Sequence, residues 1–198
     1  MALWGATDAD EAKPKWLTTA QKKEVFATSA GWVVEAGSTM TGNNNTATGV
    51  QNEVLVAISS LETALGAATI DSVDWVTTVV DKSAGFTLSA IVRWNEAVTV
   101  AVSNPTLAVT NSNAGSGSGR GPHTLVYASG SGTNELTFSL AIAAANAATN
   151  ADDVLSIAAQ SVVLASSSTI KDTGTTTVSE LVITAAQGTA AGTLTVVA

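Results

Sequence analysis

Hydrophobic and polar residues alternate along much of the chain with the period expected of β-strands. The alternation is clearest in residues 86–92, Phe-Thr-Leu-Ser-Ala-Ile-Val, and in residues 136–140, Leu-Thr-Phe-Ser-Leu. A period of two places one set of side chains on a core and the other set in water. Both segments are therefore predicted to be strands with one buried face.

From residue 70 onward, short β-runs of this kind are separated by turn clusters rich in Gly, Ser, Asn and Pro. Roughly seven to nine short strands with turns about every 8–12 residues are typical of an antiparallel β-sandwich. The predicted strands cover residues 70–80, 86–94, 98–102, 106–110, 124–128, 135–142, 154–157, 161–164 and 178–184.

The last residues, 185–198, continue with small and β-branched side chains, most regularly in residues 192–197, Gly-Thr-Leu-Thr-Val-Val. We expect a C-terminal strand here. It would either close the sandwich or add to the sheet of a neighbouring molecule.

The first 69 residues follow a different pattern. Thr18 and Gln21 have the spacing of a capping box, which predicts a short helix of about two turns that runs through Val25 and Phe26. Residues 31–35 are predicted to form a strand.

Residues 53–58 are also predicted to form a strand, followed by a short helix that begins at the Ser59-Ser-Leu-Glu62 capping box. Leu61 and Leu65 would share one face of that helix. A single helix from Val54 through Leu65 is the alternative, because the periodicity allows both.

Charge separates the beginning of the chain from the remainder. Residues 1–24 contain four acidic residues and four lysines, whereas residues 25–198 contain the other twelve acidic residues and only four basic ones. Pro14 and two tryptophans also lie in this early, densely charged stretch. Such an arm has too few apolar residues for a core of its own, so we expect it to dock on another surface.

Tryptophan and large apolar residues are the usual anchors of protein interfaces. We therefore expect the N-terminal part to dock on a partner, with folding back onto the chain's own sandwich as the alternative. The expected interface residues are Trp4, Trp16, Leu17, Val25, Phe26 and Trp32.

The overall composition excludes several classes of function. The net charge of −8 disfavours nucleic-acid and membrane-surface binding, and the longest apolar run is far shorter than the roughly 20 residues of a membrane span. The absence of cysteine removes thiol chemistry, disulfides and Cys-based metal sites. The N-terminus has neither the basic nor the apolar region of a secretory signal, so we expect synthesis in a cytoplasm without export by that route.

The candidate catalytic and metal-binding residues have simpler interpretations. His123 has no nucleophile spaced for a catalytic triad, and we interpret it as structural. Asp152 and Asp153 could supply oxygens to calcium, as could Asp71 and Asp74 or Asp172, but no EF-hand spacing is present. We expect solvated loop carboxylates, with no cofactor and no metal.

Two further segments are interpreted structurally. The Gly/Ser-rich residues 112–121 lack the Lys and Ser/Thr of a phosphate-binding loop, which predicts a flexible loop. Trp75 and Trp94 fall in predicted strands, where a core position is expected.

Four segments, in order, resemble bacterial immunoglobulin-like and cadherin-like repeats of large surface proteins. They are RWNEAVTV at 93–100, NPTLAV at 104–109, LVYASGSGTNELTF at 125–138, and SVVL at 161–164 with TIKD at 169–172. The resemblance covers about residues 70–184 and implies an Ig-like β-sandwich. The chain departs from these repeats after Asp172, where Thr-Gly-Thr replaces their glycine–asparagine turn.

The beginning of the chain has a second, shorter resemblance. Residues 3–5, 13–17 and 31–32, Leu-Trp-Gly, Lys-Pro-Lys-Trp-Leu and Gly-Trp, are similar to the openings of structural virion proteins of marine tailed phages. This resemblance implies a virion subunit released by lysis, which needs no export signal. Ig-like domains of phages decorate the shell or attach weakly to surface glycans.

Together these observations predict a mainly β protein: an N-terminal extended arm and small docking subdomain (1–69), an immunoglobulin-like antiparallel β-sandwich (70–184) and a C-terminal strand or tail (185–198). The predicted function is that of a non-enzymatic capsid decoration or cement protein on the outer capsid surface of a tailed bacteriophage. The expected partners are the major capsid protein and neighbouring copies of the chain, with a host-surface glycan as a further candidate. The alternatives are a tail- or neck-associated Ig-like virion protein and a surface adhesin or glycan-binding module.

Overall fold

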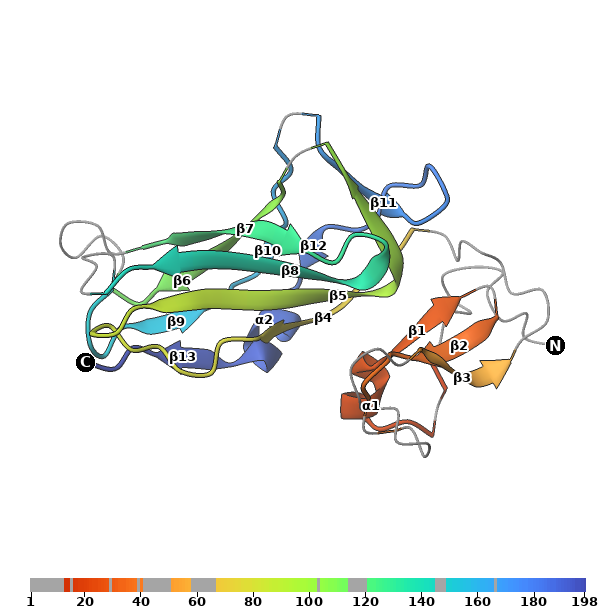
Figure 1. Ribbon diagram of the computed structural model, residues 1–198, viewed down its shortest axis with the longest axis horizontal. Coiled ribbons are helices and arrows are strands. Elements are labelled where there is room, and N and C mark those ends of the chain that lie inside the picture. Colours follow the sequence, from red (N-terminus) through yellow and green to blue (C-terminus); the bar gives the residue numbers. More distant parts are fainter. Residues whose placement is uncertain are drawn as a thin grey trace.

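A computed structural model of the 198-residue chain describes residues 13–14, 16–28, 30–38, 40, 51–57, 67–102, 104–113, 121–144, 149–165 and 167–198. The described residues are mainly β, as predicted, with two helices and one large mixed sheet (Figure 1). In chain order the elements are α1 (Thr19–Lys23), β1 (Val25–Thr28), β2 (Gly31–Val34), β3 (Glu53–Ala57), β4 (Ile70–Trp75), β5 (Phe86–Ala101), β6 (Thr106–Asn111), β7 (His123–Ser129), β8 (Thr133–Ile142), β9 (Val154–Ser156), β10 (Gln160–Ser161), β11 (Thr169–Asp172), β12 (Val182–Ile183), α2 (Ala185–Ala191) and β13 (Thr193–Thr195).

The strand order of the large sheet is β13-β9-β6-β7-β8-β5-β1-β2-β3, and β4 and β11 also pair with β5. Every pairing between these strands is antiparallel except that of β1 with β5, which is parallel. Strands β10 and β12 form a separate antiparallel pair. The long strand β5 thus pairs with β1, β4, β8 and β11, and Figure 1 shows it running along the large sheet and then bending toward β11.

Strand β5 corrects one expectation. The pattern predicts two strands at 86–94 and 98–102, but the chain continues through Asn95-Glu96-Ala97 as one strand, with a register irregularity against β8 between Arg93 and Val98. Asn95 and Glu96, the polar residues that interrupt the hydrophobic pattern, are buried and do not form a turn. Asn95 exchanges hydrogen bonds with the Thr69 backbone at 2.7 and 2.9 Å, which satisfies its amide oxygen and backbone N–H inside the protein.

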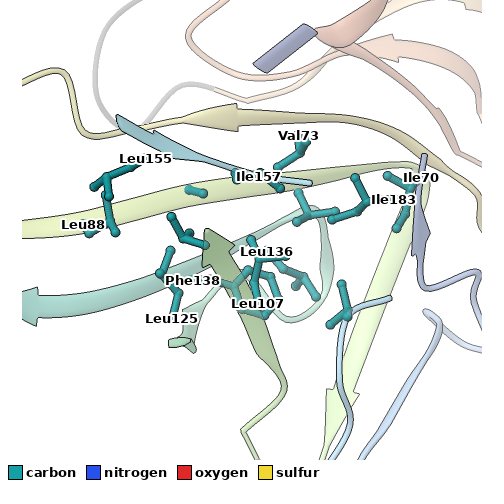
Figure 2. Close-up of a cluster of buried hydrophobic side chains, with 14 of the residues drawn as sticks. Ile70, Val73, Leu88, Leu107, Leu125, Leu136, Phe138, Leu155, Ile157 and Ile183 are labelled. Carbon is teal, nitrogen blue, oxygen red and sulfur yellow. The ribbon is translucent and has the colours of Figure 1, made fainter. Parts of the chain in front are cut away.

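The main core lies between the strands that pair around β5 and the segments that contain β9, β12 and β13. Figure 2 shows side chains from distant parts of the chain converging there, among them Leu136, Phe138 and Ile183. Trp94 belongs to the same cluster and is fully buried. Trp94 donates its Nε1 hydrogen to the Glu180 carbonyl at 2.9 Å, so its polar atom is satisfied as well. The predicted core position of Trp94 is confirmed, and Trp75 packs against the same cluster.

The C-terminal part contains a helix that the hydrophobic pattern does not indicate. The pattern predicts a strand at 178–184 and a strand or tail at 185–198, but only Val182–Ile183 and Thr193–Thr195 are strands, and α2 lies between them. The Thr184 side chain accepts from the Gln187 backbone N–H, and the Gln187 side chain accepts from the Thr184 N–H. This capping box begins the helix before the β-prone residues resume.

The N-terminal helix is shorter than predicted. The Thr18–Gln21 capping box is present, but α1 ends at Lys23, and Val25 and Phe26 belong to β1. These two residues pair with Val34 and Val33 of β2 in an antiparallel hairpin. The hairpin buries both apolar side chains on a sheet, which a two-turn exposed helix would not do.

Strand β3 confirms the strand interpretation of residues 53–57, which pair with β2. The alternative of one helix through Val54 is therefore wrong over this stretch. The predicted helix from Ser59 to Leu65 lies outside the described residues.

Candidate docking interface

The N-terminal subdomain, defined here as the described residues from 13 to 57, has a small core of its own. Leu17, Val25, Ala27, Trp32 and Val34 form a buried cluster that shares no residue with the main core. The three strands β1, β2 and β3 supply this core, which the helix alone could not. Of the charged arm of residues 1–24, Leu17 is the described residue that belongs to this cluster, so the arm packs on the strands that follow it.

The predicted interface residues differ in their exposure to solvent. Leu17, Val25, Phe26 and Trp32 are all buried inside the chain itself. Trp16, in contrast, leaves 66% of its surface exposed. Trp4 lies outside the described residues. Trp16 is therefore the predicted anchor whose side chain is available to a partner in the described part of the chain, while Leu17, Val25 and Trp32 belong to the subdomain core.

Lysines of the subdomain meet acidic residues of the body, defined as the described residues from 67 to 198. Lys13 forms an ion pair with Asp71 on β4, and Lys23 Nζ lies 2.6 Å from Asp74 Oδ1 on the same strand. Lys13 is nearly buried, with 10% of its side chain exposed, and also donates to the Lys22 carbonyl at 2.6 Å. Burial lowers the pKa of Lys13, and the neighbouring Asp71 carboxylate opposes that effect.

The ion pairs continue into the body. Arg93 on β5 places Nη1 2.7 Å from Asp74 Oδ2, and its Nε binds Glu135 on β8. Asp74 thus contacts one cation from the subdomain and one from the body. Asp71 and Asp74, two of the five aspartates considered as calcium ligands, are ion-pair partners of Lys and Arg side chains. Among the described residues, no three His, Asp or Glu side chains are grouped as a metal site would require.

A backbone contact joins the same two parts. Ala27 of β1 pairs with Glu96 of β5 in a parallel bridge of the large sheet. We use the term junction for this bridge together with the ion pairs of Lys13, Lys23 and Arg93. A contact made mainly of charged side chains and one bridge resembles the polar interfaces between domains more than a continuous core.

Glu35 follows β2 and adds an unusual acid to the junction. Burial is the main cause that raises the pKa of its carboxyl to about 7, and the charge of Glu135 and a hydrogen bond with it act in the same direction. Arg93 opposes the shift, and Glu24 adds to it. No sequence pattern marked Glu35, because the residues that perturb it most, Glu135 and Arg93, lie about 60 to 100 positions away in the chain.

Two other carboxylates are buried, which corrects the expectation of solvated loop residues. Asp153 is 0% exposed and accepts hydrogen bonds from Asn111 Nδ2 at 2.9 Å, Asn113 Nδ2 at 2.7 Å and the Asn150 N–H at 2.8 Å. Asp172 is also buried and accepts from the Ala68 N–H and the Ser179 hydroxyl. Both act as hydrogen-bond acceptors that fix loops to the body.

His123 is buried beside this network at the start of β7. Its Nε2 has no hydrogen-bond partner among the described residues. Burial lowers the pKa of His123, while the Asp153 charge opposes the shift. The structural interpretation of His123 therefore stays our prediction for this residue. The loop predicted at 112–121 lies mostly outside the described residues.

A shallow hollow of about 410 Å³ lies between α2 and the segment after β9. Its lining consists of small and apolar residues and a few hydroxyls, with no charged side chain and no histidine. Gly188 of α2 approaches the Ile157 carbonyl so closely that a Cβ there would lie 2.3 Å from the oxygen. The lining of the hollow offers no acid, base or ion-binding side chain.

Comparison with known proteins adds no family to these observations: no protein-family model, no curated protein and no solved structure matches the chain. Neither of the two described helices has the length and apolar character needed to cross a membrane.

Proposed function

We propose that this protein is a non-enzymatic structural protein of a tailed-phage virion, a decoration or cement protein on the outer capsid surface. In this proposal the N-terminal subdomain docks on the major capsid lattice and contacts neighbouring copies of the chain. The body is an Ig-like β-sandwich that projects outward. The support is the arrangement of a small, separately cored subdomain on a larger β-body, together with the two sequence resemblances.

The observation that carries the proposal is the position of Trp16. Its neighbour Leu17 is buried in the subdomain core and Thr18 caps α1, so the backbone on one side of Trp16 is held in place. The Trp16 ring nevertheless stays 66% exposed. A large aromatic ring held at the surface of an ordered segment is a typical interface anchor, because binding it costs little conformational entropy.

Strand β3 supports a lateral contact at the same end of the molecule. It is the last strand in the order of the large sheet, and β2 is its partner among the described strands. Val54 on this strand is 53% exposed. An outer strand with an exposed branched apolar side chain is suited to pair with an extended segment of a neighbouring subunit.

The charge of the chain favours an outer over an inner position on the shell. Residues 25–198 carry twelve acidic and four basic residues, and packaged DNA would repel such a surface.

Strand order is consistent with the Ig-like part of the proposal: the antiparallel neighbours β6-β7-β8-β5 contain most of the segments that carry the resemblance to bacterial Ig-like repeats.

A sedimentation assay tests the proposal. Particles from a phage stock that lacks the gene for this chain are mixed with the purified protein, and the bound fraction is measured after pelleting. We expect saturable binding that weakens at least about tenfold for Trp16→Ala, as for the loss of an interface anchor. Val79→Ala, which removes an exposed apolar side chain of the body, is the matched control and should bind like the parent.

Other outcomes would contradict the proposal. If the Trp16→Ala variant binds as well as the parent, Trp16 is not the anchor. If the parent protein does not bind to particles, the proposed virion function is wrong. Binding to a glycan array in the absence of particle binding would favour the glycan-binding alternative. Labelling confined to the tail or neck would favour the tail-associated alternative.

A further inference from the structure

Val102 is a large apolar residue in an unfavourable position. It follows β5, and its side chain is 82% exposed, the largest exposed fraction among the large hydrophobic residues that the structure describes. Its φ of +78° lies in the left-handed region of backbone space. A β-branched residue is an outlier there, because its Cβ crowds the following carbonyl oxygen, whereas Gly, Asn and Asp adopt this conformation more readily. The packing of the chain itself therefore does not account for valine at this position.

The backbone around Val102 is held by the fold and protrudes from it. The antiparallel pairing of β5 with β11 extends to Ala101 and Thr169, directly beside Val102. Before β11, the Ser168 N–H donates to the Ala165 carbonyl at 2.9 Å and closes a turn. Figure 1 shows the end of β5 and the beginning of β11 at the top of the view, above the rest of the large sheet. The tip is defined here as the exposed residues Val102, Ala165 and Ser167.

The hollow between α2 and the segment after β9 is a concave surface of similar chemistry. It has a volume of about 410 Å³, and its lining includes Ala158, Ala159, Ala185 and Thr189 but no charged side chain. These four residues are exposed, so the hollow is open to solvent. In Figure 1, α2 and β9 lie on the lower side of the body and the tip lies at its top, so a chain does not place its tip in its own hollow.

We propose that the tip of one copy of the chain inserts Val102 into the hollow of a neighbouring copy. Because the tip and the hollow are different surfaces, the contact is head-to-tail, and it either closes into a ring of copies or continues as a row. This contact joins body to body and thus adds to the lateral contact of β3. It rests on the proposed function because a shell holds copies of the chain side by side.

Charge favours a second copy as the occupant of the hollow. The chain carries a net charge of −8, so copies repel each other at long range. The three residues of the tip are uncharged, and so is the lining of the hollow. The contact therefore removes no charge from water, which would otherwise oppose it. A strongly charged partner, such as a nucleic acid or an anionic glycan, would find no ion-pair partner in the lining.

The burial of Val102 provides the driving force. A valine that is 82% exposed loses contact with water when it enters a hollow lined by alanine side chains. The pairing of β5 with β11 already orders the backbone beside it, so binding costs little conformational entropy. The area of one tip is small, and we expect a Kd of about 0.1–1 mM for two free chains. Copies held next to each other on a shell would associate more strongly through their effective concentration.

Sedimentation velocity of the purified chain alone measures this contact at chain concentrations up to about 1 mM. Val102→Asp changes the tip and Ala159→Glu changes the hollow. Val79→Asp repeats the first change at a valine that is 67% exposed and belongs to neither surface, so it is the matched control. Aspartate tolerates the left-handed backbone of position 102. We expect the parent and Val79→Asp to self-associate, and the other two variants each to associate at least about tenfold more weakly.

An equimolar mixture of the Val102→Asp and Ala159→Glu variants tests the head-to-tail geometry. The first variant keeps an intact hollow and the second keeps an intact tip, so the mixture should form a heterodimer although neither variant associates alone. A mixture that stays monomeric would overturn the proposal, and so would a parent chain that is monomeric at about 1 mM. Association that Val102→Asp abolishes and Ala159→Glu leaves unchanged would place the tip on another surface. Thr189→Glu, on the exposed part of the lining, replaces Ala159→Glu if that variant does not fold.

Val102→Asn separates a role in contact from a role in folding. Asparagine adopts the left-handed backbone more readily, so the midpoint of thermal unfolding should equal or exceed that of the parent while self-association weakens. A midpoint several degrees below that of the parent would show that Val102 stabilises the chain and would overturn the proposal. The outcome is independent of particle binding: Trp16→Ala, which should bind particles weakly, should self-associate like the parent.

Discussion

The Asp74 carboxylate on β4 lies 2.7 Å from the Arg93 guanidinium on β5, and its other oxygen lies 2.6 Å from the Lys23 ammonium of the N-terminal subdomain. One aspartate therefore connects the body to the subdomain through two cations. The side chains of Asp74, Arg93 and Lys23 are 17–33% exposed, so water screens these pairs only in part.

Replacing Asp74 with asparagine should weaken the junction. The amide that replaces the carboxylate would be an uncharged partner for two cations, and we expect the free energy of unfolding to fall by about 1–2 kcal/mol. Urea unfolding monitored by tryptophan fluorescence measures this change. Asp152→Asn, at an exposed left-handed position that asparagine tolerates, is the control and should change stability by less than about 0.5 kcal/mol. Equal stability of both variants would show that the Asp74 pairs contribute nothing.

Gly188 in α2 should not tolerate alanine, although alanine usually stabilises a helix by about 1 kcal/mol over glycine. A Cβ at this position would lie 2.3 Å from the Ile157 carbonyl oxygen, so α2 or the segment after β9 would have to move. We expect Gly188→Ala to lose about 2–4 kcal/mol in thermal or urea unfolding. Thr189→Ala, at an exposed position of the same helix, should be nearly neutral. A stabilised Gly188→Ala variant would contradict the close packing.

The capping box of α2 should contribute measurably to stability. Thr184→Ala removes the side-chain oxygen that accepts from the Gln187 backbone N–H, and such a loss costs about 1 kcal/mol. The measurement is the midpoint of thermal unfolding, with Thr184→Ser, which keeps the acceptor, as the control. A Thr184→Ala variant as stable as Thr184→Ser would indicate that α2 does not need its cap.

His123 should make the protein less stable in mild acid. Burial lowers its pKa in the folded state, so the unfolded chain takes up a proton first as the pH falls below about 6.5. The stabilisation that neutral His123 provides is present above that pH and is lost as the pH falls through the folded pKa. The measurement is the free energy of unfolding at several pH values between about 5 and 8. We expect it to fall less with decreasing pH in the His123→Gln variant than in the parent. Parallel profiles for the two chains would exclude His123 as a source of acid sensitivity.

Individual residues show which elements of the fold a local sequence pattern can predict. Period-two alternation located β5 and β8, and the Thr18–Gln21 spacing located the start of α1, because these signals are local. The same kind of signal was present in Thr184 and Gln187 and would have indicated α2, but the β-branched residues on both sides of the helix obscured it.

The candidate site depended on contacts that local patterns do not contain. The local sequence allows Val25 and Phe26 to be either helical or extended. Their pairing with Val34 and Val33 makes them part of a strand. The junction brings Glu35 to Glu135, one hundred positions away, so neither the shifted pKa of Glu35 nor the ion pairs of Asp74 could be predicted from the sequence.

The central claim, that this chain is an outer capsid protein docked through its N-terminal subdomain, is tested most directly by a cryo-electron microscopy map of the assembled particle. We predict density for the β-body on the outer capsid surface, with α1 and Trp16 against the shell and β4 to β13 pointing away from it. A particle whose shell carries no such density, or a map in which the subdomain points to solvent while the body contacts the lattice, would contradict this account.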